Sequence, residues 1–376
     1  MALKICLVAN TLYYPQGGGH RWVYLNWALG LRALGCQVIW LETVAPYTPM
    51  HVLQANTAVL KNHLGQYGLA ECIALCPWTN ETLPAEAMAE CLDLDAVVEA
   101  DLLLNLQYSL PPETVKRFRR SALVDIDPGL LQIWMSQGLV SVARHDVYFT
   151  IGETVGQPGT QLPDTGHQWH YTPPCIALDW WLQCPATEGA SFTTVSHWYA
   201  DEWMEEGGEG YANDKRSGFL PFLALPQRTT PPLELALCMQ DDDDEWEILR
   251  EHGWRTRYSW EVASTPRDYQ QYIQGSLGEF SCVKPSCVRL QNAWISDRTL
   301  CYLASGKPVI VQHTGPSRFL PDSAGLFRFH DIEEAARLLE MVVADYEQQC
   351  RLARALAEEY FDARKVIGCV LERALP

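Results

Sequence analysis

The chain has 376 residues, of which 48% are hydrophobic and 20% are charged, and its formal net charge is −18. This is the composition of a compact globular protein, and the length predicts two domains of roughly 150–200 residues each. The acidic balance excludes a broad nucleic-acid-binding surface, because phosphate backbones are bound by clusters of lysine and arginine that the sequence does not contain.

The first half of the sequence alternates strand-like and helix-like segments. Residues 4–10 form a short apolar run, residues 19–35 repeat apolar side chains at helical spacing until Gly35, and residues 37–42 are again strand-like. Strand, glycine loop, helix and strand is the opening unit of a parallel sheet with right-handed crossovers. Helices are expected from residue 50, over 84–92 and from 111, and further strands are expected at residues 71–77, 101–108, 121–127, 147–153 and 167–174.

Proline and tryptophan interrupt the pattern until about residue 192, and we place the domain boundary there. The alternation then starts again at residues 233–239 and ends in a long helical pattern from residue 331 onward. Between them we expect strands at 279–286, 307–312 and 325–329 and a helix at 296–305. The predicted domains are residues 1–185 and 186–350, with residues 351–376 forming a helix that packs back toward the first domain.

The sequence lacks the pattern of a signal peptide and its cysteines are scattered, and both features predict a cytoplasmic protein. No stretch approaches 18 consecutive apolar residues, and residues 1–10 run into a strand without the regions of a signal peptide. The thirteen cysteines occur singly, without zinc-ligand spacing, so reduced thiols and no metal site are expected. A bridge between Cys282 and Cys287 is the less favoured alternative.

Two segments resemble the glycosyltransferases of the GT-B fold, families 1 and 4 in particular. Residues 292–315 (NAWISDRTLCYLASGKPVIVQHTG) are similar to the donor-binding segment, in which a loop enters a helix that ends in a small residue, Gly, Lys or Arg, and Pro. Residues 13–42 are similar to the first strand-loop-helix unit of that superfamily. The resemblance implies an α/β protein with two Rossmann-like doubly wound domains facing each other across a cleft. The first domain would bind the acceptor and the second the nucleotide-sugar donor.

The donor diphosphate is expected at the start of the helix at residues 296–305. A helix N-terminus presents unpaired N–H groups and the positive end of the helix dipole, which suits a pyrophosphate near Trp294, Ser296, Asp297 and Arg298. Ser296 or Asp297 is equally expected as the N-cap. Arg298 lies where the dipole disfavours a cation, so we expect a countercharge nearby, either Asp297 or a ligand phosphate.

Other donor contacts are expected at the ends of two neighbouring strands. Lys284 follows a strand at the edge where open α/β sheets bind ligands, so it either neutralises phosphates or is a solvated loop lysine. The resemblance implies that Thr314 and Gly315 lie near the donor's sugar or phosphates. The two glutamates that many retaining members carry fall on Ala293 and Cys301, so that pattern is missing.

The acceptor side is expected around a run of three glycines. Gly18 and Gly19 let the backbone approach a ligand closely, and His20 follows them. In inverting GT-B enzymes a histidine at this place takes the acceptor's proton and a carboxylate orients it. The resemblance therefore implies His20 as the general base, with Asp127 as its catalytic partner and Asp125 as a second carboxylate at the cleft. A neutral imidazole can accept a hydroxyl proton near pH 7.

Each of these residues also has a simpler interpretation. His20 can be a hydrogen-bond donor at a helix N-terminus or a phosphate contact, and Asp127 opens an Asp-Pro-Gly turn.

The expected function is metal-independent transfer of a hexosyl or other glycosyl group from a nucleotide-diphosphate sugar, which is a co-substrate, with no cofactor. The acceptor is a small molecule, a lipid or a glycan, and no nucleic-acid partner is expected. The donor base, the sugar, the stereochemical outcome and the oligomeric state stay open. Two alternatives are a GT-B-like sugar-nucleotide epimerase and a non-catalytic scaffold that binds a nucleotide sugar, which the missing glutamate pair makes credible.

Overall fold

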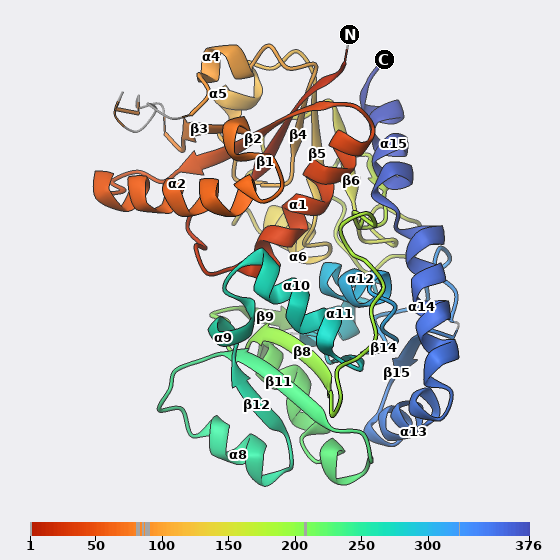
Figure 1. Cartoon of the computed structure of the whole chain (residues 1–376). Coiled ribbons are helices and arrows are strands. Elements are labelled where there is room, and N and C mark those ends of the chain that lie inside the picture. Colours follow the sequence, from red (N-terminus) through yellow and green to blue (C-terminus); the bar gives the residue numbers. More distant parts are fainter. Residues whose placement is uncertain (1, 80–82, 85, 87–90, 207–208, 323) are drawn as a thin grey trace. The chain divides into compact units, whose positions relative to one another are not determined.

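The computed structural model describes residues 2–79, 83–84, 86, 91–206, 209–322 and 324–376 (Figure 1). The chain divides into two compact units, Met1–Ala177 with Asp362–Pro376 (unit 1) and Leu178–Phe361 (unit 2). These boundaries differ from the predicted ones at 185/186 and 350/351. The second difference arises because helix α14 (Tyr346–Tyr360) packs on helix α12 (Asp297–Ala304), where Arg354 donates to the carbonyl oxygens of Trp181 and Ala304, both at 2.6 Å.

Unit 1 is built on a parallel sheet with the strand order β3-β2-β1-β4-β5-β6-β7 among its described residues. The strands are β1 (Lys4–Ala9), β2 (Gln37–Val44), β3 (Ile73–Pro77), β4 (Leu102–Asn105), β5 (Ser121–Asp125), β6 (Val147–Thr150) and β7 (Trp169–Tyr171). The strands are buried almost throughout, as in parallel sheets covered on both faces, which is why they read as continuous apolar runs. The order reverses between β1 and β4, so the predicted doubly wound topology is confirmed.

The helices of unit 1 include one from the end of the chain. They are α1 (Gly18–Ala33), α2 (Met50–Gly65), α4 (Leu94–Val97), α5 (Pro112–Val115), α6 (Leu130–Ser136) and α15 (Ala363–Ala374). Helix α15 packs on α1 at Gly30, where a Cβ atom would lie 2.5 Å from Ile367 and 2.6 Å from Ala363. Glycine is therefore required for this close approach. The helix predicted at residues 84–92 lies largely outside the described residues.

Unit 2 repeats the same topology with the order β12-β11-β8-β13-β14-β15, again all parallel. The strands are β8 (Phe192–His197), β11 (Leu233–Cys238), β12 (Arg255–Tyr258), β13 (Gly278–Ser281), β14 (Val309–Gln312) and β15 (Leu326–Phe329). The sequence analysis started the alternation of this domain at residue 233 and missed β8, which lies at the centre of the sheet. It also missed an antiparallel hairpin, β9 (Trp203–Glu206) and β10 (Glu209–Ala212).

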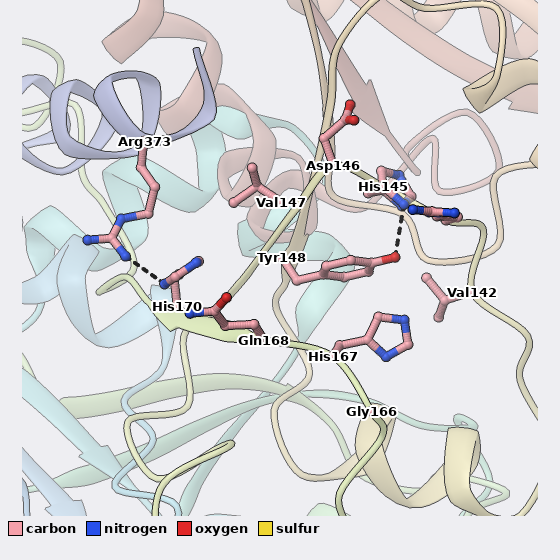
Figure 2. A pocket seen from close by; sticks show the side chains of 11 residues that line it. Val142, His145, Asp146, Val147, Tyr148, Gly166, His167, Gln168, His170 and Arg373 are labelled. Carbon is pink, nitrogen blue, oxygen red and sulfur yellow. Dashed lines mark hydrogen bonds between the residues drawn. The ribbon is translucent and has the colours of Figure 1, made fainter. Parts of the chain in front are cut away.

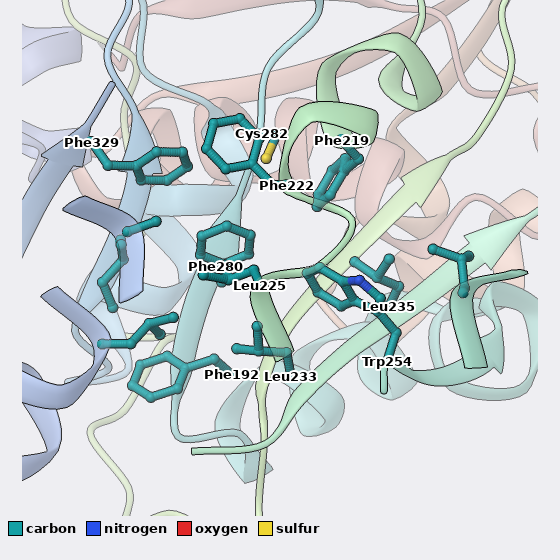
Figure 3. Packing of buried hydrophobic residues seen from close by; sticks show 14 of the residues in the cluster. Phe192, Phe219, Phe222, Leu225, Leu233, Leu235, Trp254, Phe280, Cys282 and Phe329 are labelled. Carbon is teal, nitrogen blue, oxygen red and sulfur yellow. The ribbon is translucent and has the colours of Figure 1, made fainter. Parts of the chain in front are cut away.

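The core of unit 2 is rich in aromatic side chains (Figure 3). The rings of Phe280 and Phe329 stack with centroids 5.2 Å apart, and Phe222 meets Phe329 edge-on at 5.0 Å. Aromatic pairs contribute stability beyond the area that they bury. This packing fixes β13 and β15 and thereby the edge of the sheet where both strands end.

The remaining helices of unit 2 connect and cover this sheet. They are α7 (Lys215–Phe219), α8 (Glu245–Glu251), α9 (Ser259–Ala263), α10 (Pro266–Gly275), α11 (Pro285–Leu290) and α13 (Ile332–Ala344). Across the described part of the chain, every helix is too short or too polar to cross a lipid bilayer.

Candidate functional site

The strand order of unit 2 reverses between β8 and β13, and open α/β sheets bind ligands at the carboxyl ends of the strands at such a point. The two strands pair only at Gly278 with Phe192 and at Glu279 with Thr193. Beyond these residues the strands separate. A side chain from α12 enters between them.

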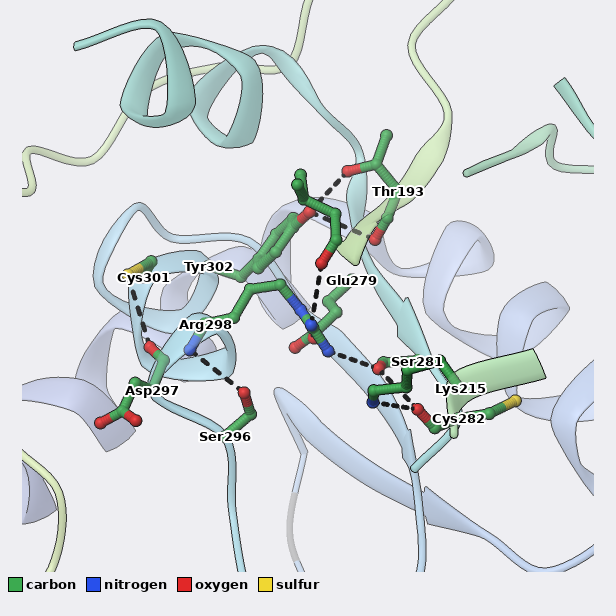
Figure 4. Close-up of polar contacts among 11 residues, drawn as sticks. Thr193, Lys215, Glu279, Ser281, Cys282, Ser296, Asp297, Arg298, Cys301 and Tyr302 are labelled. Carbon is green, nitrogen blue, oxygen red and sulfur yellow. Dashed lines mark hydrogen bonds and ion pairs between the residues drawn. The ribbon is translucent and has the colours of Figure 1, made fainter. Parts of the chain in front are cut away.

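That side chain is Arg298, whose guanidinium links three neighbours (Figure 4). Nε donates to Glu279 Oε1 at 2.8 Å, Nη1 to the carbonyl oxygen of Val195 at 3.0 Å, and Nη2 to Ser281 Oγ at 2.6 Å. Glu279 is fully buried and the arginine side chain is 12% exposed. Glu279 thus supplies a countercharge beside Arg298. Arg298 holds the diverging strands together.

A lysine that the sequence analysis did not single out lies beside this ion pair. Lys215, the first residue of α7, is half-buried, and its Nζ donates to the carbonyl oxygen of Cys282 at 2.6 Å (Figure 4). Burial, followed by the nearby charge of Arg298, lowers the pKa of Lys215 to about 7. A bound anion would favour the ammonium form. The site therefore holds a cation that a phosphate can stabilise.

The loop before α12 is strained and is joined to the end of β14. Gln291 and Ala293 have φ angles of 49° and 56°, which residues other than glycine rarely adopt. The backbone N–H of Ala293 donates to the carbonyl oxygen of Thr314 at 2.9 Å, and Thr314 Oγ1 donates to that of Trp294 at 2.7 Å. The structure thus brings together the two loops predicted to contact the donor.

Gly315 makes this junction possible. Its φ is 115°, and a Cβ atom there would lie 2.7 Å from the carbonyl oxygen of Gln291. At the start of α12, Ser296 is the N-cap and accepts from the backbone N–H of Arg298 at 3.3 Å, while Asp297 is in the first turn. The hydroxyl of Ser296 is thus engaged in capping.

Lys284 forms an ion pair next to the β9–β10 hairpin of unit 2. Its Nζ lies 2.9 Å from Glu202 Oε2, which also accepts from Asn213 Nδ2 at 2.6 Å, and Asn213 Oδ1 accepts from the backbone N–H of Ser286 at 3.0 Å. Lys284 is thus paired with a carboxylate. The sequence analysis did not single out Glu202, which directly precedes the unrecognised strand β9.

In unit 1 a buried carboxylate shapes the loop after β1. Glu42 of β2 is 1% exposed and accepts from the backbone N–H groups of Thr11 and Leu12 at 2.9 and 3.1 Å and from Trp40 Nε1 at 2.8 Å. Burial raises the pKa of Glu42. The carboxylate fixes the loop that leads into Gly18 and Gly19, which form the first turn of α1.

His20 follows these glycines in α1 and is half-buried. Its Nε2 lies 2.6 Å from the carbonyl oxygen of Asn10, and its ring lies 4.6 Å from that of Tyr14 and 5.4 Å from that of Tyr24. A carbonyl oxygen only accepts, so Nε2 carries a proton. In the neutral ring Nδ1 is then the basic nitrogen.

The two aspartates at the end of β5 differ in burial. Asp125 is 1% exposed, and its oxygens accept from Gln132 Nε2 at 2.9 Å, from Thr150 Oγ1 at 2.8 Å and from the backbone N–H of Asp127 at 3.0 Å. Burial raises the pKa of Asp125 to about 6. Both of its oxygens are engaged in hydrogen bonds, and those of Oδ2 join the end of β5 to β6 and α6. Asp127 is exposed at the turn before α6.

No family model and no curated protein sequence matches this chain. Solved structures do match it over its whole length. A glycosyltransferase from Rickettsia africae gives a TM-score of 0.57 at 11% identity, covering 99% of this chain and 98% of that one. A sucrose-phosphate synthase from Thermosynechococcus elongatus gives 0.54 at 10% identity, with coverage of 99% and 98%. The Anabaena protein HepE in complex with UDP-glucose gives 0.56 at 11% identity, with 99% of both chains covered. At these identities the similarity shows the fold, and the chain has the two-domain α/β fold of the GT-B glycosyltransferases.

Proposed function

We propose that this protein is a glycosyltransferase that moves a sugar from a nucleotide-diphosphate sugar to an acceptor hydroxyl, and that unit 2 binds the donor. The observation that carries the proposal is the carboxyl edge of the second sheet. There the start of α12, the strained loop at residues 291–296 and Lys215 lie around the point where the strand order reverses. HepE, a protein of the same fold, was solved with UDP-glucose.

In this proposal the donor diphosphate lies at the amide groups that open α12, near Trp294, Ser296 and Asp297. Lys215 supplies the positive charge, because Arg298 is already paired with Glu279. Thr314 borders the same position through its hydrogen bond to Trp294, and Gly315 through its close approach to Gln291. Lys284 reaches a phosphate only by leaving Glu202, so we give it a secondary role.

The acceptor is bound by unit 1, with His20 as the general base. The carbonyl oxygen of Asn10 holds the proton on Nε2, so that Nδ1 takes the proton of the acceptor hydroxyl. This carbonyl group orients the imidazole of His20, a role that was expected of a carboxylate. Asp127 stays in the proposal as a second catalytic residue, because it is exposed after β5, at the same carboxyl edge of the sheet.

The reaction follows from these roles. The acceptor oxygen forms a bond to the anomeric carbon while the bond from that carbon to the phosphate oxygen breaks. His20 receives the hydroxyl proton, and the leaving nucleoside diphosphate keeps the electron pair. Helix amides and Lys215 stabilise its charge, so no step requires a metal ion.

A ligand screen tests the donor assignment. UDP, ADP, GDP and dTDP, and their glucose esters, are added in a thermal-shift experiment, followed by calorimetric titration of the ligand that raises the melting temperature. A ligand at one hundred times its Kd stabilises the fold by about 2.7 kcal/mol. Lys215→Met should weaken binding by about tenfold or more, whereas Lys116→Met, at an exposed lysine of unit 1, should not. Failure of every nucleotide to bind, or equal affinity in Lys215→Met, would overturn the proposal.

The same preparation separates the two alternatives. An epimerase would convert the sugar of the donor without any acceptor, which a transferase should not do. A scaffold would bind the donor and never release its sugar, either to water or to an acceptor.

A further inference from the structure

A cavity of about 570 Å³ lies within unit 1, at the edge opposite to the proposed acceptor site. Its wall comes from the segment before β6, the starts of β6 and β7, and helix α15 (Figure 2). The polar side chains that matter here are Arg144, His145, Tyr148, His167, His170 and Arg373. All belong to one unit, so the shape of the cavity does not depend on the other unit.

Two cations of this cavity lack an acidic partner. In the part of the chain that the structure describes, neither Arg144 nor Arg373 has a carboxylate within ion-pair distance. The acid in the wall is Asp146, which accepts from the backbone N–H and the hydroxyl of Ser121 and lies 3.6 Å from Arg120. On a chain with a net charge of −18, this concentration of unpaired arginine is a local basic site.

Two histidines of the cavity wall are fixed by hydrogen bonds. Nδ1 of His170 accepts from Arg373 Nη1 at 2.6 Å, so its Nε2 carries a proton (Figure 2). Burial and Arg373 both lower the pKa of His170, which keeps this neutral form. Nδ1 of His167 donates to the carbonyl oxygen of Thr165 at 2.7 Å. Both rings are therefore held in defined orientations.

Tyr148 and His145 form a rigid, neutral part of the wall. The Tyr148 ring lies 4.3 Å from that of His167, and its hydroxyl accepts from the backbone N–H of His145 at 2.9 Å (Figure 2). His145 donates through Nδ1 to Ala143 and accepts at Nε2 from Asn105, and burial lowers its pKa to about 4. A ring with both nitrogens engaged is not a metal ligand. Among the described residues no group of His, Cys, Asp and Glu is arranged to hold a metal ion.

We propose that this cavity is a second small-molecule site, which binds a phosphate monoester of about monosaccharide size. Guanidinium groups match the oxygens of a phosphate in a two-bond geometry, and Arg144 and Arg373 each bring such a group to the lining of this cavity. The volume lies within the range of small-molecule pockets, roughly 300–1,000 Å³, and exceeds what a bare phosphate fills. The inference does not rest on the proposed glycosyl transfer.

Ribose 5-phosphate is the probe, titrated into the full chain by calorimetry with ribose as the uncharged control. The phosphate ester should bind and ribose should not. The double variant Arg144→Met/Arg373→Met should weaken binding by about tenfold or more. Arg364→Met, an exposed arginine on the same helix α15, is the matched control and should bind as the wild type does.

Site-resolved NMR with histidine labelled at ¹³Cε1 locates the probe. The resonances of His167 and His170, assigned with His167→Gln and His170→Gln, should move on addition of ribose 5-phosphate. Lys215→Met should leave this binding unchanged, which separates the cavity from the donor site. Absence of binding, equal affinity in the double arginine variant, or loss of binding in Lys215→Met would each overturn the inference.

Discussion

The two sheets have the same strand order but place different charged groups at their carboxyl edges. In unit 1 the buried carboxylate Glu42 shapes the loop that leads to His20, and the buried Arg21 lies near its charge. In unit 2 the corresponding edge holds Lys215 and Arg298, with Glu279 as the buried acid paired to Arg298. In the function that we propose, one topology provides a place for a hydroxyl and a base in the first unit and a place for a diphosphate in the second.

The largest expected effect tests the unit 1 side of this comparison. His20→Ala should lower kcat by about 10²–10⁴-fold, because the acceptor proton loses its base. Donor affinity, measured by calorimetry, should stay unchanged, since we propose that unit 2 binds the donor. Asn10 supplies only its backbone, so Asn10→Ala is the matched control and should retain most of the activity. If His20→Ala transferred the sugar as fast as the wild type, His20 would not be the general base.

The next effect tests the buried pair of unit 2. Arg298→Met leaves Glu279 buried without its partner and should lower the free energy of unfolding by about 3–5 kcal/mol. Urea unfolding measures this loss. Adding Glu279→Gln should recover a good part of it, because the unpaired charge is gone. A loss below about 1 kcal/mol would show that the pair does not hold β8 to β13.

A stabilising substitution extends the comparison of the two units, because unit 2 also buries a cation away from the carboxyl edge of its sheet. Lys307 is fully buried, and its Nζ has no hydrogen-bond partner among the described residues. Burial lowers the pKa of Lys307, so the unfolded chain binds this proton more readily than the folded chain does. The resulting loss of folding stability becomes smaller as the pH rises toward the ordinary pKa of lysine.

Lys307→Met should therefore raise the free energy of unfolding at pH 7 by about 1–3 kcal/mol. Lys116→Met, at a lysine that is 68% exposed, should change it by less than about 0.5 kcal/mol. A destabilised Lys307→Met would mean that this lysine has a partner of its own.

The smallest effect is a pH dependence. The pKa of Lys215 is about 7 in the unliganded protein, and a phosphate binds the ammonium form. Donor affinity should therefore be constant below pH 7 and fall by about tenfold per pH unit above it. Lys215→Arg should bind with no such fall, because arginine keeps its charge. The same slope in Lys215→Arg would assign the titration to another group.

The sequence predicted the parallel strands because each one is a buried apolar run. It also placed Trp294 and Thr314 in one site, since the carboxyl ends of parallel strands meet at one edge. It missed β8, where threonines 193 and 194 interrupt the apolar pattern, and with β8 it missed Lys215. The partners of charged groups were beyond its reach, because Glu279 and Glu202 meet Arg298 and Lys284 only through contacts distant along the chain.

Hydrogen–deuterium exchange with and without the bound nucleotide sugar tests the central assignment most directly. The account predicts slower exchange at residues 291–300 and 313–315 of unit 2, where the loop, the start of α12 and the end of β14 meet. It predicts little change at residues 11–20 of unit 1. Protection confined to unit 1, with the start of α12 exchanging as before, would contradict the account.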